Sequence, residues 1–280
     1  MKLAICNETF RDWDFPRAFA FARECGYTGI EFAPFTMGRD ARDISPDRRR
    51  IVTRQVEDAG LTTVGLHWLL AKTEGYYLTS PDAVVRHRTS EYLSELARLC
   101  RDLGGTIMVL GSPQQRNLLP GVSHDDAMRY AADVIRGSID VLRECGVTLA
   151  VEPLGPQEGD FLLTADLGAK LVELVAAPEC RLHLDVKAMS SEGRPIPDII
   201  RDHAGILAHF HANDANRRGP GMGEIDFVPI LRTLRQVGYQ GWISVEVFDY
   251  EPGVEALAGQ SIAYLKKCLA RVEASGASSR

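Results

Sequence analysis

The chain has 280 residues, of which 45% are hydrophobic, and carries a formal net charge of -6. A chain of this length buries a large core, either as one barrel-sized domain or as two ordinary domains. The acidic balance and the lack of a long basic run argue against a nucleic-acid partner. No apolar stretch reaches the length of a membrane span, so we expect no membrane partner.

The N-terminus and the cysteines point to the cytoplasm. The opening "MKLAICNETF" lacks the long apolar core of a signal peptide and is typical of a first strand. Six cysteines are scattered along the chain without a C-x-x-C pair, which is typical of reduced, structural cysteines. We therefore expect a cytoplasmic protein.

Short apolar runs alternate with amphipathic segments along the whole chain. The runs predict strands, in chain order, at residues 2–6, 28–33, 62–67, 106–111, 147–152, 181–186, 206–212 and 242–247. The segments between them predict helices at residues 15–26, 46–60, 81–105, 124–146, 164–177 and 227–238. Expected N-terminal caps are Ser123, Thr164 and Asp226, and expected C-terminal caps are Gly26, Gly60, Gly104, Gly146 and Gly238.

This alternation has the dimensions of a (β/α)8 TIM barrel. Eight strand–helix units within about 250 residues, without a linker-like break, match one closed parallel barrel. We assign it to residues 1–274 as a single domain and expect residues 275–280 to form a frayed tail. An open doubly wound sheet is the alternative, but it usually carries a glycine-rich phosphate loop after its first strand. The corresponding turn here, "NETFRDW", contains no glycine.

Four of the predicted strands end in side chains that bind metals. Glu152, Asp185, His211 and Glu246 each close one of four consecutive strands, and the carboxyl ends of barrel strands meet at one face. A single such residue is explained equally well by a helix cap or an arginine partner. Three carboxylates at one site cannot all stay ionised without a cation. Oxygen-rich ligation with one imidazole favours manganese, magnesium or cobalt.

The second half of the chain resembles a known superfamily. The matching stretches are "AVEPLG", "LHLDVKAM", "HFHANDANRRGPGMGEIDF" and "GWISVEVFDY"; the first half matches by architecture and by "GIEF". Together they resemble the xylose-isomerase-like TIM barrels, also called sugar phosphate isomerases/epimerases. The sequence is most similar to ketose 3-epimerases, then to hydroxypyruvate isomerases and inosose dehydratases.

The resemblance implies roles for individual residues. Residues that match Glu152, Asp185, His211 and Glu246 hold one divalent metal, usually manganese, and the two glutamates also act as acid/base groups. Glu158 and Arg217 match positions that contact substrate. Ala188 stands where the epimerases carry a substrate-contacting histidine, and Lys187 is the candidate substitute.

The predicted site supports more than one reaction. A substrate that chelates the metal through a carbonyl and a neighbouring hydroxyl becomes more acidic at the adjacent C–H, and two carboxylates on opposite faces of the enediolate then transfer protons. We predict a metal-dependent isomerase or epimerase of a small sugar or keto-sugar. The alternative is a lyase, an inosose dehydratase or an enzyme of 3-keto-glycoside elimination, which the change at Ala188 favours. An abasic-site endonuclease is a third possibility, but it needs several zinc ions and more histidine ligands than the predicted strand ends supply. A non-catalytic sugar-binding module is a fourth, and the intact ligand set argues against it.

Other polar and aromatic residues lie at the predicted strand ends and in the loops that follow them. His67 and Trp68 are expected to line the pocket, Glu31 to orient a ligand or substrate, and Lys187 to supply positive charge. Packing explains His67 and Trp68 equally well. His183 and His209 are expected one layer below the ligands, Arg116 and Arg218 in solvent, and the loops at residues 68–80 and 212–226 over the site. The sequence leaves open whether the chain forms a homo-oligomer.

Overall fold

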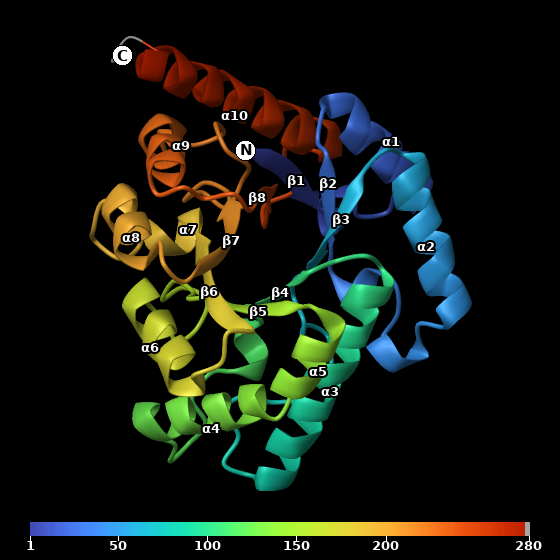
Figure 1. The fold of residues 1–280 in the computed structure, drawn as a ribbon, viewed down its shortest axis with the longest axis vertical. Helices are drawn as coiled ribbons and strands as arrows, with labels where there is room; N and C mark the ends of the chain where they lie inside the picture. The colour runs from blue at the N-terminus through green and yellow to red at the C-terminus, as the bar shows by residue number, and fades with distance from the viewer. Residues whose placement is uncertain (278–280) are drawn as a thin grey trace.

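The computed structural model describes residues 1–277, and its strands close into a parallel barrel in chain order (Figure 1). The barrel closes where Lys2 pairs with Trp242 and Ile5 with Val245. Its strands are β1 (Lys2–Cys6), β2 (Gly29–Phe32), β3 (Thr62–Leu66), β4 (Ile107–Leu110), β5 (Thr148–Val151), β6 (Cys180–Asp185), β7 (Leu207–Ala212) and β8 (Trp242–Val245). The predicted (β/α)8 TIM barrel is therefore confirmed.

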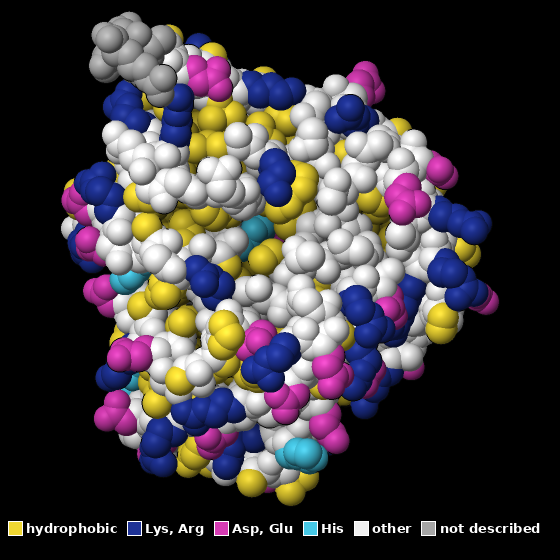
Figure 2. Space-filling model, viewed as in Figure 1, with side chains coloured by type: hydrophobic (Ala, Val, Ile, Leu, Met, Phe, Trp, Pro, Cys, Tyr) yellow, Lys and Arg dark blue, Asp and Glu magenta, His cyan; other side chains and the backbone are white. Residues whose placement is uncertain are grey.

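Helices surround this barrel, as Figure 1 shows, and α10 packs against α1 and α9 to close the ring. They are α1 (Phe15–Cys25), α2 (Pro46–Asp58), α3 (Ala83–Asp102), α4 (His124–Arg136), α5 (Ile139–Cys145), α6 (Ala165–Val175), α7 (Val186–Met189), α8 (Ile196–His203), α9 (Phe227–Gln236) and α10 (Val254–Ala277). On the face shown in Figure 2, charged side chains lie mainly over the outer helices, and a central hollow shows hydrophobic side chains and a histidine.

Two features of the helices differ from the prediction. The segment 124–146 forms two helices, because the chain breaks at Gly137 and Ser138 between α4 and α5. A Cβ at Gly137 would clash with Ser90 of α3, so the close approach of α3 requires glycine there. The expected tail begins within α10, which continues to Ala277; residues 278–280 lie outside the described part of the chain.

The predicted N-terminal caps are confirmed, as are the C-terminal caps Gly26 and Gly146, whereas Gly60, Gly104 and Gly238 lie one residue beyond the caps of α2, α3 and α9. Side chains of Ser123, Thr164 and Asp226 each accept a hydrogen bond from a backbone N–H of the helix that follows. Gly26 and Gly146 end α1 and α5 in the left-handed conformation, with φ of 99° and 64°. These caps satisfy helix-end groups that would otherwise lack partners.

The barrel interior is polar towards the carboxyl ends of its strands. Glu31, His183, His209 and His211 are all fully buried there. Strand pairing shifts register next to two of them, between Ile30 and Glu31 and between Leu182 and His183. Since buried polar groups must find partners or ligands, this layer marks the end of the barrel where the chemistry is expected.

Two further expectations concern the whole chain. All six cysteines are free, as expected for reduced cysteines. Within residues 1–277, no helix combines the length and the apolar character needed to cross a bilayer.

Candidate metal centre and substrate cavity

The structure brings the four predicted metal ligands together at the carboxyl ends of β5 to β8. Glu152, Asp185 and His211, together with His183, each offer a ligand atom, and these atoms all lie within 4.8 Å of one another. Glu246 Oε2 lies 3.0 Å from His211 Nδ1. The proximity of these side chains follows from the closed barrel, whereas their role as ligands remains a prediction.

His183 is the member of this cluster that the sequence reasoning set aside. It precedes Asp185 by two residues on β6 and therefore faces the same side of the strand. Both of its ring nitrogens are buried without a hydrogen-bond partner among the described residues, and Nε2 lies 3.8 Å from Glu152 Oε1. The His-x-Asp spacing was the available signal for placing an imidazole beside the metal cluster.

The pKa shifts of the carboxyl groups indicate whether the cluster suits a cation. Burial raises the pKa of Glu152 well above its usual range, and the nearby Glu246 and Asp185 raise it further. Burial also raises the pKa of Asp185, against the opposing effect of Lys187. Three buried carboxylates beside imidazole nitrogens without partners form a donor set that fits a divalent metal with a preference for oxygen and nitrogen ligands.

Neighbouring groups hold Asp185 in position. Asp185 Oδ1 accepts a hydrogen bond of 2.8 Å from the backbone N–H of Ala188, and Oδ2 accepts one of 2.5 Å from Asn213 Nδ2. Asn213 Oδ1 in turn accepts from the backbone N–H of Lys187 at 2.8 Å. Asn213, which the sequence analysis did not select, thus links the loop after β7 to the first turn of α7.

Glu31 lies beneath His211 and outside the cavities. Its carboxylate lies 3.2 Å from His211 Nε2 and 2.8 Å from His209 Nε2. Burial alone would raise the pKa of Glu31, but His209 and His211 lower it well below its usual range. A carboxylate on the far nitrogen of a ligand histidine fixes the ring orientation, so Glu31 orients a candidate ligand and does not contact the cavity.

Arg116 corrects an expectation, because it is 1% exposed and not a solvated loop residue. Its guanidinium donates to the carbonyls of Leu110, Glu152 and Phe161 at 3.2, 2.6 and 3.4 Å. Burial lowers the pKa of Arg116 to about 10, against the opposing charges of Glu152 and Glu158. The carbonyls after β4 and β5 need donors where the strand ladder ends, and the folded-back loop supplies them through Arg116.

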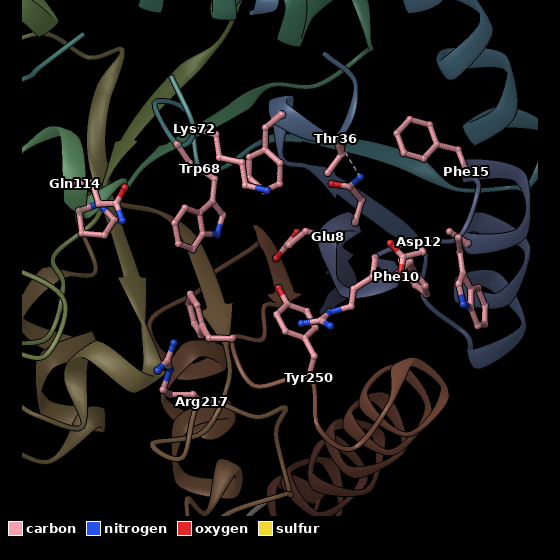
Figure 3. A pocket seen from close by; sticks show the side chains of 18 of the residues that line it. Glu8, Phe10, Asp12, Phe15, Thr36, Trp68, Lys72, Gln114, Arg217 and Tyr250 are labelled. Atoms are coloured by element: carbon pink, nitrogen blue, oxygen red, sulfur yellow. Dashed lines mark hydrogen bonds between the residues drawn. The ribbon is translucent and has the colours of Figure 1, made fainter. Parts of the chain in front are cut away.

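A cavity of about 690 Å³ lies beside the cluster (Figure 3). Its wall is rich in aromatic side chains: Phe10, Trp13, Phe15, Phe35, Trp68, Phe248 and Tyr250. A much smaller cavity, of about 10 Å³, is bordered by Glu152, Glu158 and Glu246. Trp68, Pro113 and Phe248 line both, so these three residues form the partition between the large cavity and the two glutamates.

Both loops expected over the site border the large cavity. The loop at residues 68–80 contributes Trp68, Ala71 and Lys72, and the loop at residues 212–226 contributes Arg217. Trp68 has a left-handed backbone, with φ of 53°, and its Nε1 donates to Glu246 Oε1 at 2.9 Å. The indole therefore contacts one of the two candidate acid/base residues directly.

The remaining substrate-binding candidates have different surroundings. Lys187 Nζ donates to Glu158 Oε2 and lies 4.4 Å from the centre of the Phe248 ring. His67 is 1% exposed and bonds to Glu8, so it does not reach the cavity itself. Arg217 lies at the exposed rim of the cavity.

Arg218 is bound outside the site. Its guanidinium pairs with Asp249 and Glu251, in a partly exposed loop. The preference for a role outside the active site is thus confirmed for Arg218.

A family model described as xylose isomerase-like TIM barrel matches residues 19–268. The chain belongs to this family. It is 30% identical to an L-ribulose 3-epimerase of Mesorhizobium japonicum over 239 residues, which cover 84% of this chain and 76% of that one. The expected resemblance to ketose 3-epimerases is therefore confirmed.

Two solved structures extend the comparison. The structure of an L-ribulose 3-epimerase has a TM-score of 0.85 at 24% identity and covers 99% of this chain and 97% of its own. A 3-keto-D-glucoside 4-epimerase from E. coli has a TM-score of 0.82 at 20% identity, covering 96% of this chain and all (100%) of its own. At these identities the likeness shows the fold alone, so the reaction must be argued from the site.

Proposed function

We propose that this member of a sugar epimerase and isomerase family is a divalent-metal-dependent enzyme that moves a proton next to the carbonyl of a keto-sugar. The observation that carries the proposal is the pair Glu152 and Glu246, which follow non-adjacent strands and border the same small cavity. In the metal-free chain their pKa values are shifted in opposite directions. Burial and neighbouring carboxylates raise the pKa of Glu152. Burial would also raise the pKa of Glu246, but the charge and hydrogen bond of His211 lower it below its usual range.

The two carboxyl groups are placed to exchange protons with a substrate between them. As ligands of a cation both are ionised, so either can accept a proton from the substrate and return it afterwards. Glu152 follows β5 and Glu246 follows β8, so β6 and β7 separate them around the barrel. Two carboxyl groups placed apart in this way can serve the two faces of a flat enediolate, which inverts a carbon centre.

We further propose that Glu152, Asp185, His211 and Glu246 hold the metal, with manganese as the expected ion and magnesium or cobalt as the other candidates. When bound, a divalent cation would polarise the substrate carbonyl and lower the pKa of the neighbouring C–H. Asn213 and Glu31 keep Asp185 and His211 in fixed orientations, as the hydrogen bonds above describe. Lys187 supplies the positive charge that balances the developing oxyanion.

Lys187 and Ala188 also favour the interpretation that the substrate differs from those of the ketose 3-epimerases. Its ammonium group pairs with Glu158, and Ala188, at the position of the epimerase histidine, is buried and offers no hydrogen-bonding side chain. We therefore propose that Lys187, the residue before Ala188, contacts the substrate through its ammonium group. A lyase acting on an inosose or a 3-keto-glycoside is the second candidate for the same reason.

The test is a screen of the manganese-loaded enzyme against keto-sugars, inososes and 3-keto-glycosides in deuterated solvent. We expect one class to yield a product of unchanged covalent composition that carries one solvent deuterium at the inverted or isomerised position, read by mass and NMR. Loss of water or of an aglycone from the product identifies a lyase. Absence of deuterium incorporation and of any product across the screen would refute the proposed proton-transfer chemistry.

A further inference from the structure

Glu8 is a buried carboxylate that the proposed mechanism does not use. It lies in the 3-10 turn Asn7–Phe10 directly after β1 and is 8% exposed. Its Oε2 lies 2.7 Å from His67 Nε2, whereas Oε1 is buried without a hydrogen-bond partner among residues 1–277. Glu8 belongs to the wall of the large cavity, and in Figure 3 its side chain lies near the centre of that cavity.

The turn that carries Glu8 is fastened to the loop after β2. Asn7 Oδ1 accepts a hydrogen bond of 2.8 Å from the backbone N–H of Ala33, and Asn7 Nδ2 donates to Thr36 Oγ1 at 2.9 Å. The carbonyl of Glu8 accepts from the backbone N–H of Arg11 at 3.1 Å. Glu8 is therefore held from both sides, as a group prepared for binding should be.

A buried carboxylate oxygen without a donor is costly, so its partner is expected to arrive with a ligand. One ligand atom each of Glu8, His67 and Glu246 lie within 4.8 Å of one another, which places Glu8 next to the reacting end of the site. The missing partner must donate a hydrogen bond. An anionic group such as a phosphate would instead meet the like charge of Glu8.

We propose that Glu8 binds a hydroxyl group of the substrate on the carbons beyond the reacting centre. This inference rests on the proposed function and narrows its substrate class. The substrate is a neutral keto-sugar whose chain or ring continues past the partition at Trp68 and Phe248 into the aromatic cavity.

The position of His67 favours a hydroxyl over a second metal ion. Its Nε2 already bonds to Glu8, so the imidazole holds the carboxylate and leaves only Nδ1 free of a hydrogen-bond partner. Nδ1 lies 3.9 Å from Glu31 Oε1, on the side away from Glu8. Metal content nonetheless forms one arm of the test.

The experiment combines Glu8→Ala and Glu8→Gln with a series of deoxy analogues of the best keto-sugar. Glu57→Gln is the matched control, because Glu57 is an exposed carboxylate on α2 that lines neither cavity. We measure kcat/KM for each pair of enzyme and substrate, together with Kd by calorimetry and metal content. Sites built around a substrate hydroxyl discriminate strongly against analogues that lack it.

For wild type and Glu57→Gln, we expect removal of one particular hydroxyl to lower kcat/KM by roughly 10- to 100-fold. In Glu8→Ala the same removal should cost less than about twofold, because the interaction is already absent. Glu8→Gln, which keeps an acceptor oxygen and the side-chain volume, should lie between them and carries the test if Glu8→Ala fails to fold.

Two results overturn the assignment. One is an equal loss for every deoxy analogue in wild type and in the Glu8 variants, by kcat/KM and by Kd. The other is a second metal ion per chain that disappears in Glu8→Ala. Failure of the proposed function has a different signature: wild type then turns over no keto-sugar, and the comparison of Kd values for the sugar series still decides whether Glu8 binds a hydroxyl.

Discussion

The two halves of the barrel mouth differ in composition and in surroundings. Strands β5 to β8 end in Glu152, Asp185, His211 and Glu246, which converge within a few ångströms. Strands β1 to β4 are followed by the residues that form most of the large aromatic cavity, among them Phe10, Phe35 and Trp68. One half thus gathers charge at the small cavity, and the other lines the large cavity with apolar surface and one buried carboxylate, Glu8.

This contrast suggests a division of labour between reaction and recognition. Proton transfer needs groups with shifted pKa values at fixed positions, and these lie on the second half of the barrel. Sugar recognition needs apolar faces and a few convergent polar groups, and these lie on the first half. Trp68 joins the two, since it comes from the loop after β3 and bonds to Glu246 after β8.

The largest expected effect tests the acid/base assignment on the second half. Glu152→Gln and Glu246→Gln each keep the shape and an oxygen ligand but remove the proton-accepting group, so turnover should fall by about a thousandfold or more. Metal affinity should fall less than turnover. Steady-state kinetics on metal-saturated variants measure the loss, with Glu57→Gln as the control.

Exchange of the substrate's acidic proton refines that result. One of the two variants should still exchange this proton with deuterated solvent, because the remaining glutamate acts alone from its own face. NMR of recovered substrate shows which variant does so and identifies the residue that starts the reaction. Near-normal turnover in either metal-loaded variant contradicts the two-base mechanism.

Metal removal should make the second half of the barrel sensitive to pH. Burial and the nearby carboxylates raise the pKa of Glu152 well above its usual range, so the neutral form is favoured in the folded, metal-free chain. The stabilising contribution is therefore fully present below the unfolded pKa and is lost as the pH rises through the raised folded pKa. The melting temperature of chelator-treated protein should accordingly decrease as the pH is raised above about 5.

Glu152→Gln provides the matched control for this pH effect. The amide does not ionise, so the metal-free variant should lose the part of the slope that Glu152 causes. Metal-loaded wild type should also be less sensitive, because the cation stabilises the ionised carboxylate. Equal slopes for the chelator-treated wild type and variant would contradict the assignment of Glu152 as the titrating group.

Metal content separates this electrostatic effect from simple loss of ligation. Asp185→Asn should bind the metal at least tenfold more weakly, because the amide keeps the hydrogen bond to Ala188 but removes the negative charge. Metal analysis after dialysis measures the change. Stoichiometric metal at unaltered affinity would remove Asp185 from the proposed ligand set.

The two halves of the barrel mouth also differ in how well the sequence predicts their structure and site residues. The closed barrel follows from the alternating pattern, and the proximity of Glu152, Asp185 and His211 follows from strand-end placement alone. Such residues lie on regular elements whose geometry repeats. The resemblance of the second half added the proposed roles.

The first half was harder to predict because its site residues lie in irregular segments. The burial of Arg116 depends on a loop that folds back under β4 and β5, and no periodic pattern encodes that path. Glu8 lies in a one-turn helix after β1, where its depth depends on the loop after β2.

Arg116 lies at the seam between the two halves, so its loss should destabilise both. In Arg116→Met the side chain keeps much of its volume, but the carbonyls of Glu152 and Phe161 lose their donor, whereas that of Leu110 keeps the backbone N–H of Glu152. Unpaired buried carbonyls of this kind should lower the free energy of unfolding by about 2–4 kcal/mol. Denaturant unfolding measures the loss, and Arg116→Lys, which can satisfy fewer of the three carbonyls, should lie between the variant and wild type. A loss below about 0.5 kcal/mol would show that water replaces the guanidinium.

The smallest expected effect lies at the contact between the halves. Trp68→Phe keeps an aromatic ring in the partition but removes the N–H that donates to Glu246 Oε1. One hydrogen bond to a charged group is worth roughly 1.5 kcal/mol, so kcat should fall by about tenfold if the bond positions Glu246 for proton transfer. KM should change less, because the ring remains in the partition. Trp68→Ala removes the ring as well and should raise KM in addition. If Trp68→Phe changes KM and leaves kcat unaltered, the indole serves recognition alone, and the two halves of the mouth act without this link.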